Sequence, residues 1–327
     1  MATFSALRIN KKGSIEELHI EQFPIPEPQA DQVLVKVEFS TINPSDYLSI
    51  LGRYPSINPP LTPGFEGSGI VVSSGGGEFA DSLLNKRVTF RGQGTWAEYC
   101  LIPALNATPL LETISLEQGA SLHVNPLTVA LFIEKINANS SRAFVQNAAA
   151  SSLGKQFVKW TQRLGIKSIN LVRRQEQVDI LKNLGAEHVF NTSEEGWKNK
   201  AKDLATELGA KVGFDAIGSI ETNDLFEIIN NDGVVYNYGL LSGKPCEINP
   251  GLLMFQGKRL EGLWLSAWFK EVNYEKRLEA CMKVQENIDI LASEYNQTVG
   301  LDGVKDALAS YMTSSTNNKV LIKTQLS

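Results

Sequence analysis

The sequence is poor in the residues that build disulfide frameworks. It has only three cysteines, Cys100, Cys246 and Cys281, which lie far apart in 327 residues. They form no cluster with the spacing of metal ligands, and an odd number argues against a set of structural disulfides. We therefore expect a reducing, cytoplasmic setting.

Long apolar runs and an excess of positive charge are also missing. No stretch of about 18 apolar residues occurs, so no membrane span is expected. The first nine residues are typical of a strand and lack the apolar core of a signal peptide. The formal net charge is −5 and the pI is about 5.4. Such a chain gains no electrostatic help in binding nucleic acid or anionic membranes, which leaves a small molecule as the expected partner.

Apolar residues make up 43% of the chain, enough for two sizeable cores. Up to about residue 117 the pattern is that of strands, such as 33–39 and 69–73, separated by proline-containing loops. From about residue 118, strands alternate with helices, which predicts a parallel, doubly wound sheet. The expected strands are 143–146, 168–172, 188–191, 212–216 and 233–238, and the expected helices include 155–164, 175–184 and 197–208.

The end of the chain predicts a long helix over 273–295, a helix near 304–311 and a strand over 319–324. This tail can return to the first domain. We therefore expect one domain from residues 1–121 and 271–327, and a nucleotide-binding domain from residues 122–270.

Residues 143–174 are the most informative segment. They predict a strand, a turn of small residues, a helix and a second strand that ends in Arg173 and Arg174. A dinucleotide pyrophosphate binds at such a helix N-terminus. The two arginines stand where an acidic residue usually binds the ribose 2′-hydroxyl, which favours NADP(H) over NAD(H). Only Gly154 remains of the usual glycines, so an ordinary βαβ crossover with two exposed arginines is an equal alternative.

Short motifs on both sides of this segment occur in a distinctive order. Asn-Pro-Ser-Asp lies at 43–46, Gly-Arg-Tyr-Pro at 52–55 and Pro-Gly-Phe-Glu-Gly at 63–67. Gly-Thr-Trp-Ala-Glu-Tyr follows at 94–99, Val-Asn-Pro-Leu-Thr at 124–128 and Trp-Leu-Ser-Ala-Trp at 264–268. In this order they resemble the medium-chain dehydrogenase/reductase superfamily, in its zinc-free quinone oxidoreductase branch. The chain is most similar to the mitochondrial type of NADPH-dependent trans-2-enoyl thioester reductase. The resemblance implies a GroES-like β-rich catalytic domain plus a Rossmann-type domain, an α/β fold.

The resemblance also predicts that the chain binds no metal. Zinc members of the superfamily hold the metal with cysteine and histidine side chains. Asn43 stands at the position of one cysteine, and Phe65 at that of the histidine. Neither side chain can build the site.

Tyr54 is the candidate catalytic residue, because the resemblance places a catalytic tyrosine in the Gly-x-Tyr segment. A phenol can hydrogen-bond a carbonyl or donate a proton to the reduced alkene. The alternative is an ordinary packing or surface aromatic. The resemblance also predicts a substrate pocket that includes Asn43, Phe65, Trp96 and Trp264.

The resemblance further implies a set of residues that contact NADP(H). Several have plain alternatives: Thr128 as a helix N-cap, Lys319 as a solvated cation, and Trp264 in a core or a dimer interface. The implied residues are Asn125, Thr128, Ala150, Ser151, Ser152, Leu153, Gly154, Arg173, Arg174, Tyr238, Gly239, Leu240, Leu241, Leu263, Trp264, Leu265, Ser266 and Lys319.

Three functions remain open from the sequence. The leading hypothesis is a reductase of 2-enoyl thioesters with Tyr54 as proton donor, and the second is an NADPH:quinone oxidoreductase. The third is an NADPH-binding protein with a structural or regulatory role, because Ser152 replaces a family glycine and Ala130 a family tyrosine. A homodimer is expected, with the apolar stretch 260–269 supplying an edge for pairing.

Overall fold

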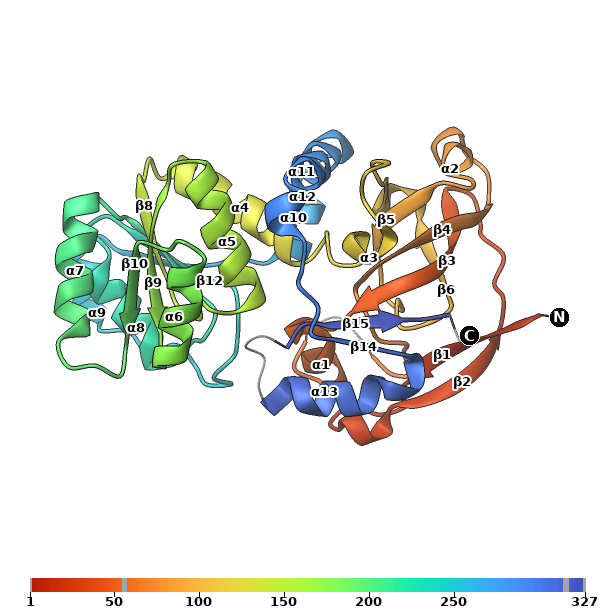
Figure 1. Ribbon diagram of the computed structural model, residues 1–327, viewed down its shortest axis with the longest axis horizontal. Coiled ribbons are helices and arrows are strands. Elements are labelled where there is room, and N and C mark those ends of the chain that lie inside the picture. Colours follow the sequence, from red (N-terminus) through yellow and green to blue (C-terminus); the bar gives the residue numbers. More distant parts are fainter. Residues whose placement is uncertain (1, 55–57, 314–317, 326–327) are drawn as a thin grey trace. The chain divides into compact units, whose positions relative to one another are not determined.

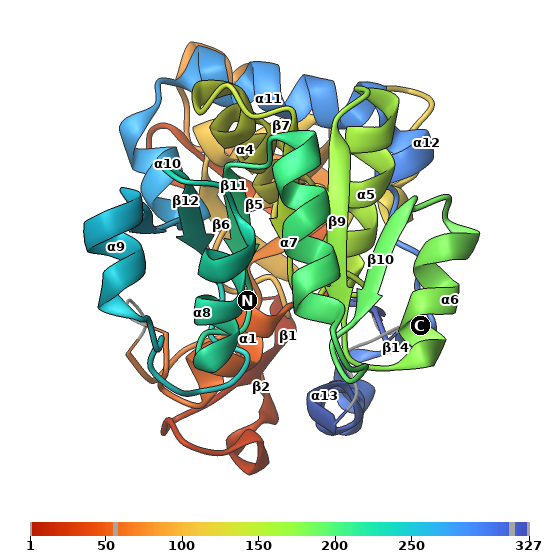
Figure 2. The ribbon, with the colours of Figure 1, turned by 90° about the vertical axis from the view of Figure 1, so that its left-hand side faces the viewer.

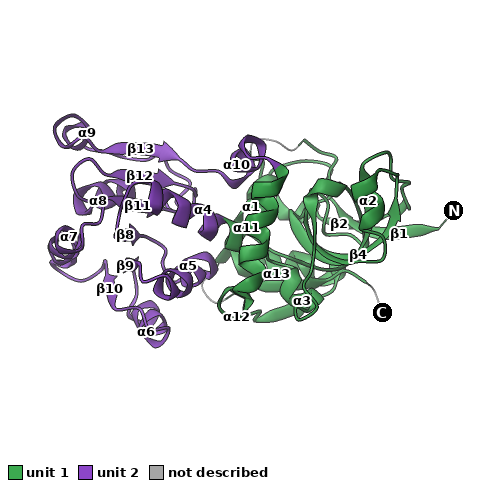
Figure 3. Cartoon of the chain, turned by 90° about the horizontal axis from the view of Figure 1, so that it is seen from above, with its two compact units in different colours: residues 1–127, 274–327 green, residues 128–273 purple. Residues whose placement is uncertain are grey.

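The computed structural model describes residues 2–54, 58–313 and 318–325. The chain forms two compact units (Figures 1 and 3). Unit 1 comprises residues 1–127 and 274–327, and unit 2 comprises residues 128–273. The C-terminal tail therefore belongs to the same unit as the N-terminal segment.

Unit 1 is rich in antiparallel strands. Its main sheet has the order β14-β15-β3-β4-β5-β7, β6 also pairs with β3, and β1 and β2 form a separate hairpin. The strands are β1 (Thr3–Arg8), β2 (His19–Pro24), β3 (Gln32–Thr41), β4 (Glu66–Ser74), β5 (Arg87–Arg91), β6 (Tyr99–Pro103), β7 (Ala107–Pro109), β14 (Gln297–Val299) and β15 (Val320–Lys323). The helices are α1 (Pro44–Ile50), α2 (Glu78–Ser82), α3 (Leu116–Gly119), α11 (Tyr274–Glu286), α12 (Ile288–Leu291) and α13 (Val304–Thr313), with 3₁₀ turns at Ile15–Glu17, Ala104–Asn106 and Leu301–Gly303.

The C-terminal tail completes one of the cores of unit 1. Strand β15 pairs antiparallel with β3, so that Leu321 lies opposite Thr41. Helix α13 contributes Val304 and Leu308 to a cluster that also holds Trp96 from the N-terminal part. Residues almost at opposite ends of the sequence thus build one core.

Unit 2 is a parallel sheet with strand order β10-β9-β8-β11-β12-β13. In chain order this is 3-2-1-4-5-6, the order of a dinucleotide-binding Rossmann fold, and it confirms the predicted fold class. The elements are α4 (Asn125–Ala138), which begins in unit 1, β8 (Ala143–Gln146), α5 (Ser152–Arg163), β9 (Lys167–Val172), α6 (Gln175–Asn183), β10 (His188–Asn191), α7 (Trp197–Leu208), β11 (Val212–Asp215), α8 (Ile220–Ile228), β12 (Val234–Asn237), α9 (Pro250–Gln256), β13 (Arg259–Gly262) and α10 (Leu265–Glu271).

Both faces of this sheet are covered by helices, as its apolar strands require. Ala143 and Val145 of β8 pack in a core with residues of α7 and α8, which lie on the near side of the sheet in Figure 2. Phe144, between them on the strand, points to the other face. There it stacks on Phe157 of α5, with ring centroids 4.1 Å apart. Two buried faces explain why the strands are apolar runs rather than alternating patterns.

Three local expectations were wrong. The helix expected over 273–295 is broken into α11 and α12 at Asn287, whose Nδ2 donates to the carbonyl of Lys283 in the last turn of α11. Of the stretch 260–269 that was expected to supply an edge, only residues 260–262 are strand, in the sixth parallel strand β13, and α10 begins at Leu265. Thr128 is not an N-cap, because α4 already begins at Asn125.

Within the described residues, none of the helices combines the length and the hydropathy that a bilayer crossing requires. In the same part of the chain, no group of three or more histidine, cysteine or acidic side chains is arranged to hold a metal ion.

Candidate functional site

The turn after β8 has the predicted small-residue shape, although it lacks two of the usual glycines. Ala148 adopts a φ of 48°, a left-handed conformation that glycine normally takes. Gly154 is required by packing, because an added Cβ would lie 2.4 Å from the carbonyl oxygen of Ala149. The turn thus keeps its close approach of helix to strand with a single glycine.

Helix α5 begins at this turn and presents backbone donors. Ser151 is its N-cap, and its Oγ accepts from the amide of Gly154 at 3.1 Å. The amides of Ser152 and Leu153 have no hydrogen-bond partner among the described residues. Unpaired N–H groups at the start of a helix attract an anion. The Ser152 hydroxyl, at the position of a family glycine, lies beside them.

Arg173 and Arg174 follow β9 directly, and both side chains are exposed. Arg174 is the N-cap residue of α6 and makes no side-chain cap hydrogen bond. The backbone of Arg173 is held by Gln177 and by Ser193, which leaves its guanidinium outside these contacts. Neither guanidinium forms an ion pair within the described ranges, so both are available to an external anion.

The residues predicted on the nicotinamide side follow β12 and β13. Leu240 and Leu241 are 52% and 44% exposed. Gly239 is needed because a Cβ there would lie 2.4 Å from the carbonyl oxygen of Ala216. Gly239 therefore allows the chain after β12 to pass close to the loop after β11.

The segment after β13 divides its residues between core and surface. Leu263 and Trp268 are buried, whereas Trp264 is 38% exposed. Leu265 and Ser266, in the first turn of α10, are half-buried. Of the two tryptophans in this segment, Trp268 lies in the interior and Trp264 is partly exposed.

A buried polar cluster in unit 1 surrounds Asn43, the residue at the family's metal-ligand position. Its Nδ2 donates to Glu66 Oε1 at 2.8 Å, and its Oδ1 accepts from Lys319 Nζ at 2.7 Å. The other oxygen of Glu66 accepts from the amides of His123 and Val124. Asp46 caps the start of α1 by accepting from the amide of Asn43 at 2.7 Å. Asp46 therefore has a structural capping role at the start of α1.

The ionisable groups of this cluster have strongly shifted pKa values because they are buried. Burial raises the pKa of Asp46 to about 8. It also raises the pKa of Glu66 and lowers that of Lys319, in each case partly offset by the attraction between the two. Asp46 Oδ1 is buried without a hydrogen-bond partner among the described residues. The shifts of Asp46 and Lys319 have opposite signs, as desolvation requires for an acid and a base.

This arrangement changes the interpretation of two predicted site residues. Lys319 is buried and its ammonium donates to Asn43 and to the carbonyl of Ile42, so it is not a solvated cation. These contacts favour a structural role over the predicted contact with a cofactor phosphate. Both polar groups of the Asn43 amide are engaged, which likewise favours a structural role over substrate binding.

Tyr54 lies beside Phe65, with ring centroids 5.4 Å apart and planes tilted by 42°. The structure thus brings two predicted site residues together, and both are partly exposed. Trp96, in contrast, is fully buried in a core and donates from Nε1 to the carbonyl of Thr41. Its predicted place in a substrate pocket is corrected to a core position.

Asn125 and Thr128 lie in the first turn of α4 and are both buried. Their predicted cofactor contacts stay predictions.

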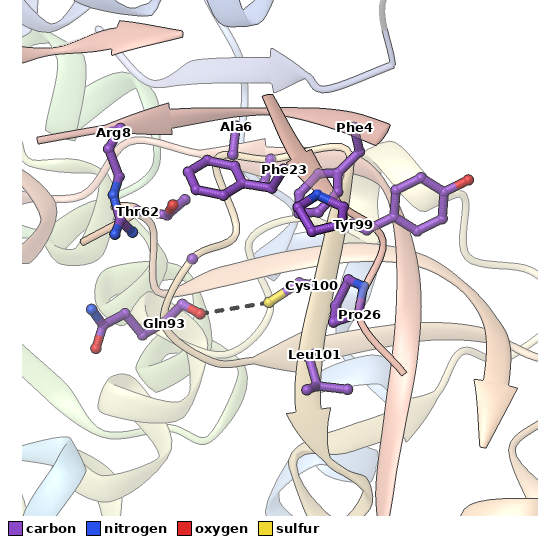
Figure 4. A pocket seen from close by; sticks show the side chains of 13 residues that line it. Phe4, Ala6, Arg8, Phe23, Pro26, Thr62, Gln93, Tyr99, Cys100 and Leu101 are labelled. Atoms are coloured by element: carbon purple, nitrogen blue, oxygen red, sulfur yellow. Dashed lines mark hydrogen bonds between the residues drawn. The ribbon is translucent and has the colours of Figure 1, made fainter. Parts of the chain in front are cut away.

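A cavity of about 340 Å³ lies in unit 1 between the β1–β2 hairpin and β6 (Figure 4). The rings of Phe4, Phe23 and Tyr99 line it, and the guanidinium of Arg8 lies 5.3 Å from the Phe23 ring centre. Cys100 donates to the carbonyl of Gln93 at its wall. No residue predicted for substrate or cofactor lines this cavity.

Sequence reasoning missed Asp215, whose side chain accepts five hydrogen bonds in unit 2. Asp215 ends β11 and is fully buried. An acidic residue at the carboxyl end of an apolar strand was the available signal.

Comparisons with known proteins agree with this geometry. Residues 29–112 match the alcohol dehydrogenase GroES-like domain, and residues 152–281 match the zinc-binding dehydrogenase model. The mitochondrial enoyl-[acyl-carrier-protein] reductase of Caenorhabditis elegans is 34% identical over 261 residues, 77% of this chain and 74% of the relative. The enzyme of that name from Arabidopsis thaliana is 31% identical over 274 residues, 80% and 72% of the two chains.

Solved structures match the whole chain. A candidate NADPH:quinone reductase from Mesorhizobium loti has a TM-score of 0.90 at 31% identity and covers 99% of both chains. Escherichia coli quinone oxidoreductase, solved with NADPH, has a TM-score of 0.86 at 23% identity and covers 99% of this chain and 100% of that one, which supports the fold alone. The chain belongs to the medium-chain dehydrogenase/reductase superfamily, in its zinc-free quinone oxidoreductase branch.

Proposed function

We propose that the protein is an NADPH-dependent oxidoreductase that reduces the activated C=C bond of a 2-enoyl thioester. Relatives at 34% and 31% identity are named enoyl-[acyl-carrier-protein] reductases. The observation that carries the choice of cofactor is the end of β9. Arg173 and Arg174 are exposed there, where NAD-dependent folds of this type carry an acidic residue.

The residues of unit 2 fit NADPH. The free amides of Ser152 and Leu153 suit a pyrophosphate, and the Ser152 hydroxyl can add a donor. The guanidinium groups of Arg173 and Arg174 suit a 2′-phosphate, which they can bind in bidentate fashion. The exposed apolar loop after β12 suits the nicotinamide end.

When bound, NADPH supplies a hydride. Reduction of a 2-enoyl thioester places negative charge on the carbonyl oxygen and requires a proton at the α-carbon. We assign both tasks to the hydroxyl of Tyr54, which can donate a hydrogen bond to the oxygen and then release a proton. The ring contact with Phe65 orients the tyrosine.

The test is NADPH oxidation with crotonyl-CoA by the wild type and by Tyr54→Phe. Removing a general acid typically costs about 10²–10⁴-fold in rate, so we expect a fall of that size in kcat. Tyr99→Phe is the matched control, because Tyr99 is a partly exposed tyrosine of the same unit, on β6. Equal activity of wild type and Tyr54→Phe would remove Tyr54 from the mechanism.

A second candidate is an NADPH:quinone oxidoreductase. The 31% identical structure from Mesorhizobium loti supports it. A quinone accepts hydride readily and needs less acid catalysis, so turnover of a naphthoquinone that survives Tyr54→Phe would favour this function. Tight NADPH binding without turnover of any activated alkene or quinone would instead favour a structural or regulatory NADPH-binding protein.

We also propose a homodimer formed at the edge of the unit 2 sheet. Within the described chain, β13 pairs only with β12, which leaves its other edge open. Beside it in the sequence, Met254 and Phe255 of α9 are 72% and 81% exposed, and Leu260 on the strand is 38% exposed. Exposed apolar side chains next to an unpaired strand edge suit a second copy of the chain. Light scattering at micromolar concentration should give twice the chain mass, and Phe255→Ser should lower it.

A cytoplasmic location is the last part of the proposal. It is supported by the cysteines, all three of which are free, with Cys100 and Cys281 buried. Curated relatives carry mitochondrial names, so fluorescence microscopy of the tagged full chain should separate the two compartments.

A further inference from the structure

Asp215 is the centre of a hydrogen-bond network at the carboxyl ends of three strands. Its Oδ1 accepts from Asn147 Nδ2 at 2.6 Å and from the amides of Ile217 and Gly218 at 2.9 and 3.0 Å. Its Oδ2 accepts from Thr222 Oγ1 at 2.6 Å and from Asn237 Nδ2 at 3.2 Å. All of these donors are neutral, and the carboxyl group is fully buried.

The bond between Asp215 and Asn147 crosses the point where the strand order reverses. Asn147 follows β8, Asp215 ends β11, and these two strands are neighbours in the sheet. The same Asn147 side chain accepts from the amide of Ala216 at 2.8 Å, so two bonds join the two strand ends. Ligands of open α/β sheets bind outside the carboxyl ends of the strands at this reversal point.

The network also fixes the loop after β12. Asn237 Nδ2 bonds both Asp215 and the carbonyl of Gly239. Asp215 also holds the loop after β11, because it accepts from two backbone amides of that loop. The carbonyls of residues 216 and 217 in this loop in turn accept from the amides of Leu241 and Ser242. The position of residues 238–242 therefore depends on the Asp215 carboxylate both through Asn237 and through the loop after β11.

A strained residue lies at the end of the loop that Asp215 holds. Ser219 has φ 62° and ψ −149°, a backbone conformation that is almost confined to glycine. Its carbonyl accepts from the amides of Thr222 and Glu247. Such strain persists only when the surrounding bonds determine the conformation. Asp215 contributes on both sides of Ser219, by accepting from the amide of Gly218 and from the hydroxyl of Thr222.

From this geometry we infer that Asp215 is a positioning residue for the cofactor. It holds the turn after β8 and the loop after β12 in register at the reversal point, without touching the cofactor itself. The inference rests on the proposed function, because these two segments are the ones assigned to the pyrophosphate and to the nicotinamide.

The test is the affinity for NADPH, measured by isothermal titration calorimetry well below the unfolding temperature. In Asp215→Asn, the amide can still accept from three donors through Oδ1, but its NH₂ group meets the NH₂ group of Asn237. Because a buried donor without an acceptor is costly, we expect the Kd for NADPH to rise about tenfold or more. Asp203→Asn, the same change at an exposed position of α7, should leave it unchanged.

Adenosine 2′-monophosphate separates positioning from general loosening of unit 2. This fragment carries the 2′-phosphate but neither the pyrophosphate nor the nicotinamide, so it reports on Arg173 and Arg174, which lie outside the network. We expect its Kd to change less than about threefold in Asp215→Asn, since no bond of the network reaches β9. Equal losses for the fragment and for NADPH would overturn the positioning role, as would an unchanged Kd for NADPH.

Thr222→Val covers the case in which Asp215→Asn does not fold. It removes one hydrogen bond to Oδ2 with little change of shape, and we expect the Kd for NADPH to rise about threefold with the fragment unaffected. An unchanged Kd for NADPH would again overturn the inference. A wild type that binds neither NADPH nor the fragment would instead refute the proposed function, and the inference with it.

Discussion

The two units bury acidic side chains at comparable depth but stabilise them differently. In unit 2, Asp215 is bonded only to neutral donors, five in all. In unit 1, Glu66 and Asp46 share a buried cluster with the ammonium of Lys319, linked through the amide of Asn43. The Asp215 network links the ends of neighbouring strands through hydrogen bonds from neutral donors. The unit 1 cluster places acidic groups near the positive charge of Lys319.

This difference predicts different sensitivities. The stability of a buried carboxylate with neutral donors depends on the positions of those donors. Substitutions of Asp215 or of its donors should therefore disturb the loops that carry the donors. A cluster of three ionisable groups depends on its protonation state. Burial raises the pKa of Asp46 to about 8 and lowers that of Lys319, so pH and the removal of charge should act on unit 1.

Removing the ammonium of Lys319 should give the largest effect. Lys319→Met leaves the buried Glu66 carboxylate without its cation, and we expect a loss of about 3–5 kcal/mol in the free energy of unfolding. Urea denaturation measures it. Lys323→Met is the matched control, because it lies on the same strand but is exposed, and it should change stability by about 0.5 kcal/mol or less. Similar losses in both variants would mean that the unit 1 cluster does not depend on its cation.

The pH dependence of stability gives the second test. Because the pKa of Asp46 is raised, the folded protein keeps a proton that the unfolded chain releases above about pH 4. The free energy of unfolding should therefore fall as pH rises towards 8, by up to about 1.4 kcal/mol per pH unit. Asp46→Asn removes this contribution.

Between pH 5 and pH 7, wild type should thus lose about 2–3 kcal/mol relative to Asp46→Asn. Urea denaturation at three pH values measures the difference. Asp306→Asn, at an exposed position of α13, should follow the wild-type profile. Parallel profiles for wild type and Asp46→Asn would contradict the protonated state of Asp46.

The sequence pattern was sufficient for five strands of the doubly wound sheet, including the edge strand β10, but not for the bounds of β13 at the other edge. Strands such as β8 and β11 are apolar on both faces, and their runs are bounded by turn residues. Strand β13 reads Arg-Leu-Glu-Gly, only four residues with two charges, because it is an edge strand with no second neighbour in the described chain. Residues 259–262 form a strand because they pair with β12, and the local sequence pattern carries no information about that pairing.

The candidate site was predictable where a role depends on local sequence. The turn after β8 and the arginines after β9 were expected, and the structure places them at strand ends. Lys319 was misread because its partner Asn43 lies 276 residues away. Asp215 was missed for the same reason, since its donors come from residues as distant as Asn147, 68 residues earlier.

The shape of the turn in unit 2 gives a third, smaller effect. In Gly154→Ala, the new Cβ would approach the backbone oxygen of Ala149 to 2.4 Å, so the helix must shift. We expect a loss of about 2 kcal/mol in the free energy of unfolding, measured in urea. Gly251→Ala is the control, because its Cβ meets nothing closer than 3.2 Å in the first turn of α9. A stable Gly154→Ala variant would show that the turn relaxes easily.

The smallest expected effect on stability, and the clearest one on function, comes from the exposed cations of unit 2. Arg173→Ala and Arg174→Ala remove guanidinium groups that form no ion pair among the described residues, so stability should change by about 0.5 kcal/mol or less. The Kd for NADPH should rise about tenfold, while that for NADH stays nearly constant, because only NADPH carries the 2′-phosphate. Titration of both cofactors measures the ratio.

Arg163→Ala, on the neighbouring helix α5, provides a control for net charge, because it removes one positive charge at the far end of that helix. It should leave the ratio of the two Kd values unchanged. If Arg163→Ala alters the ratio as much as Arg173→Ala does, the preference arises from the overall field of unit 2. If only the two arginines after β9 alter the ratio, the exposed cations of unit 2 differ in role from the buried cation of unit 1. The buried Lys319 then serves the fold of unit 1, and the exposed arginines serve binding in unit 2.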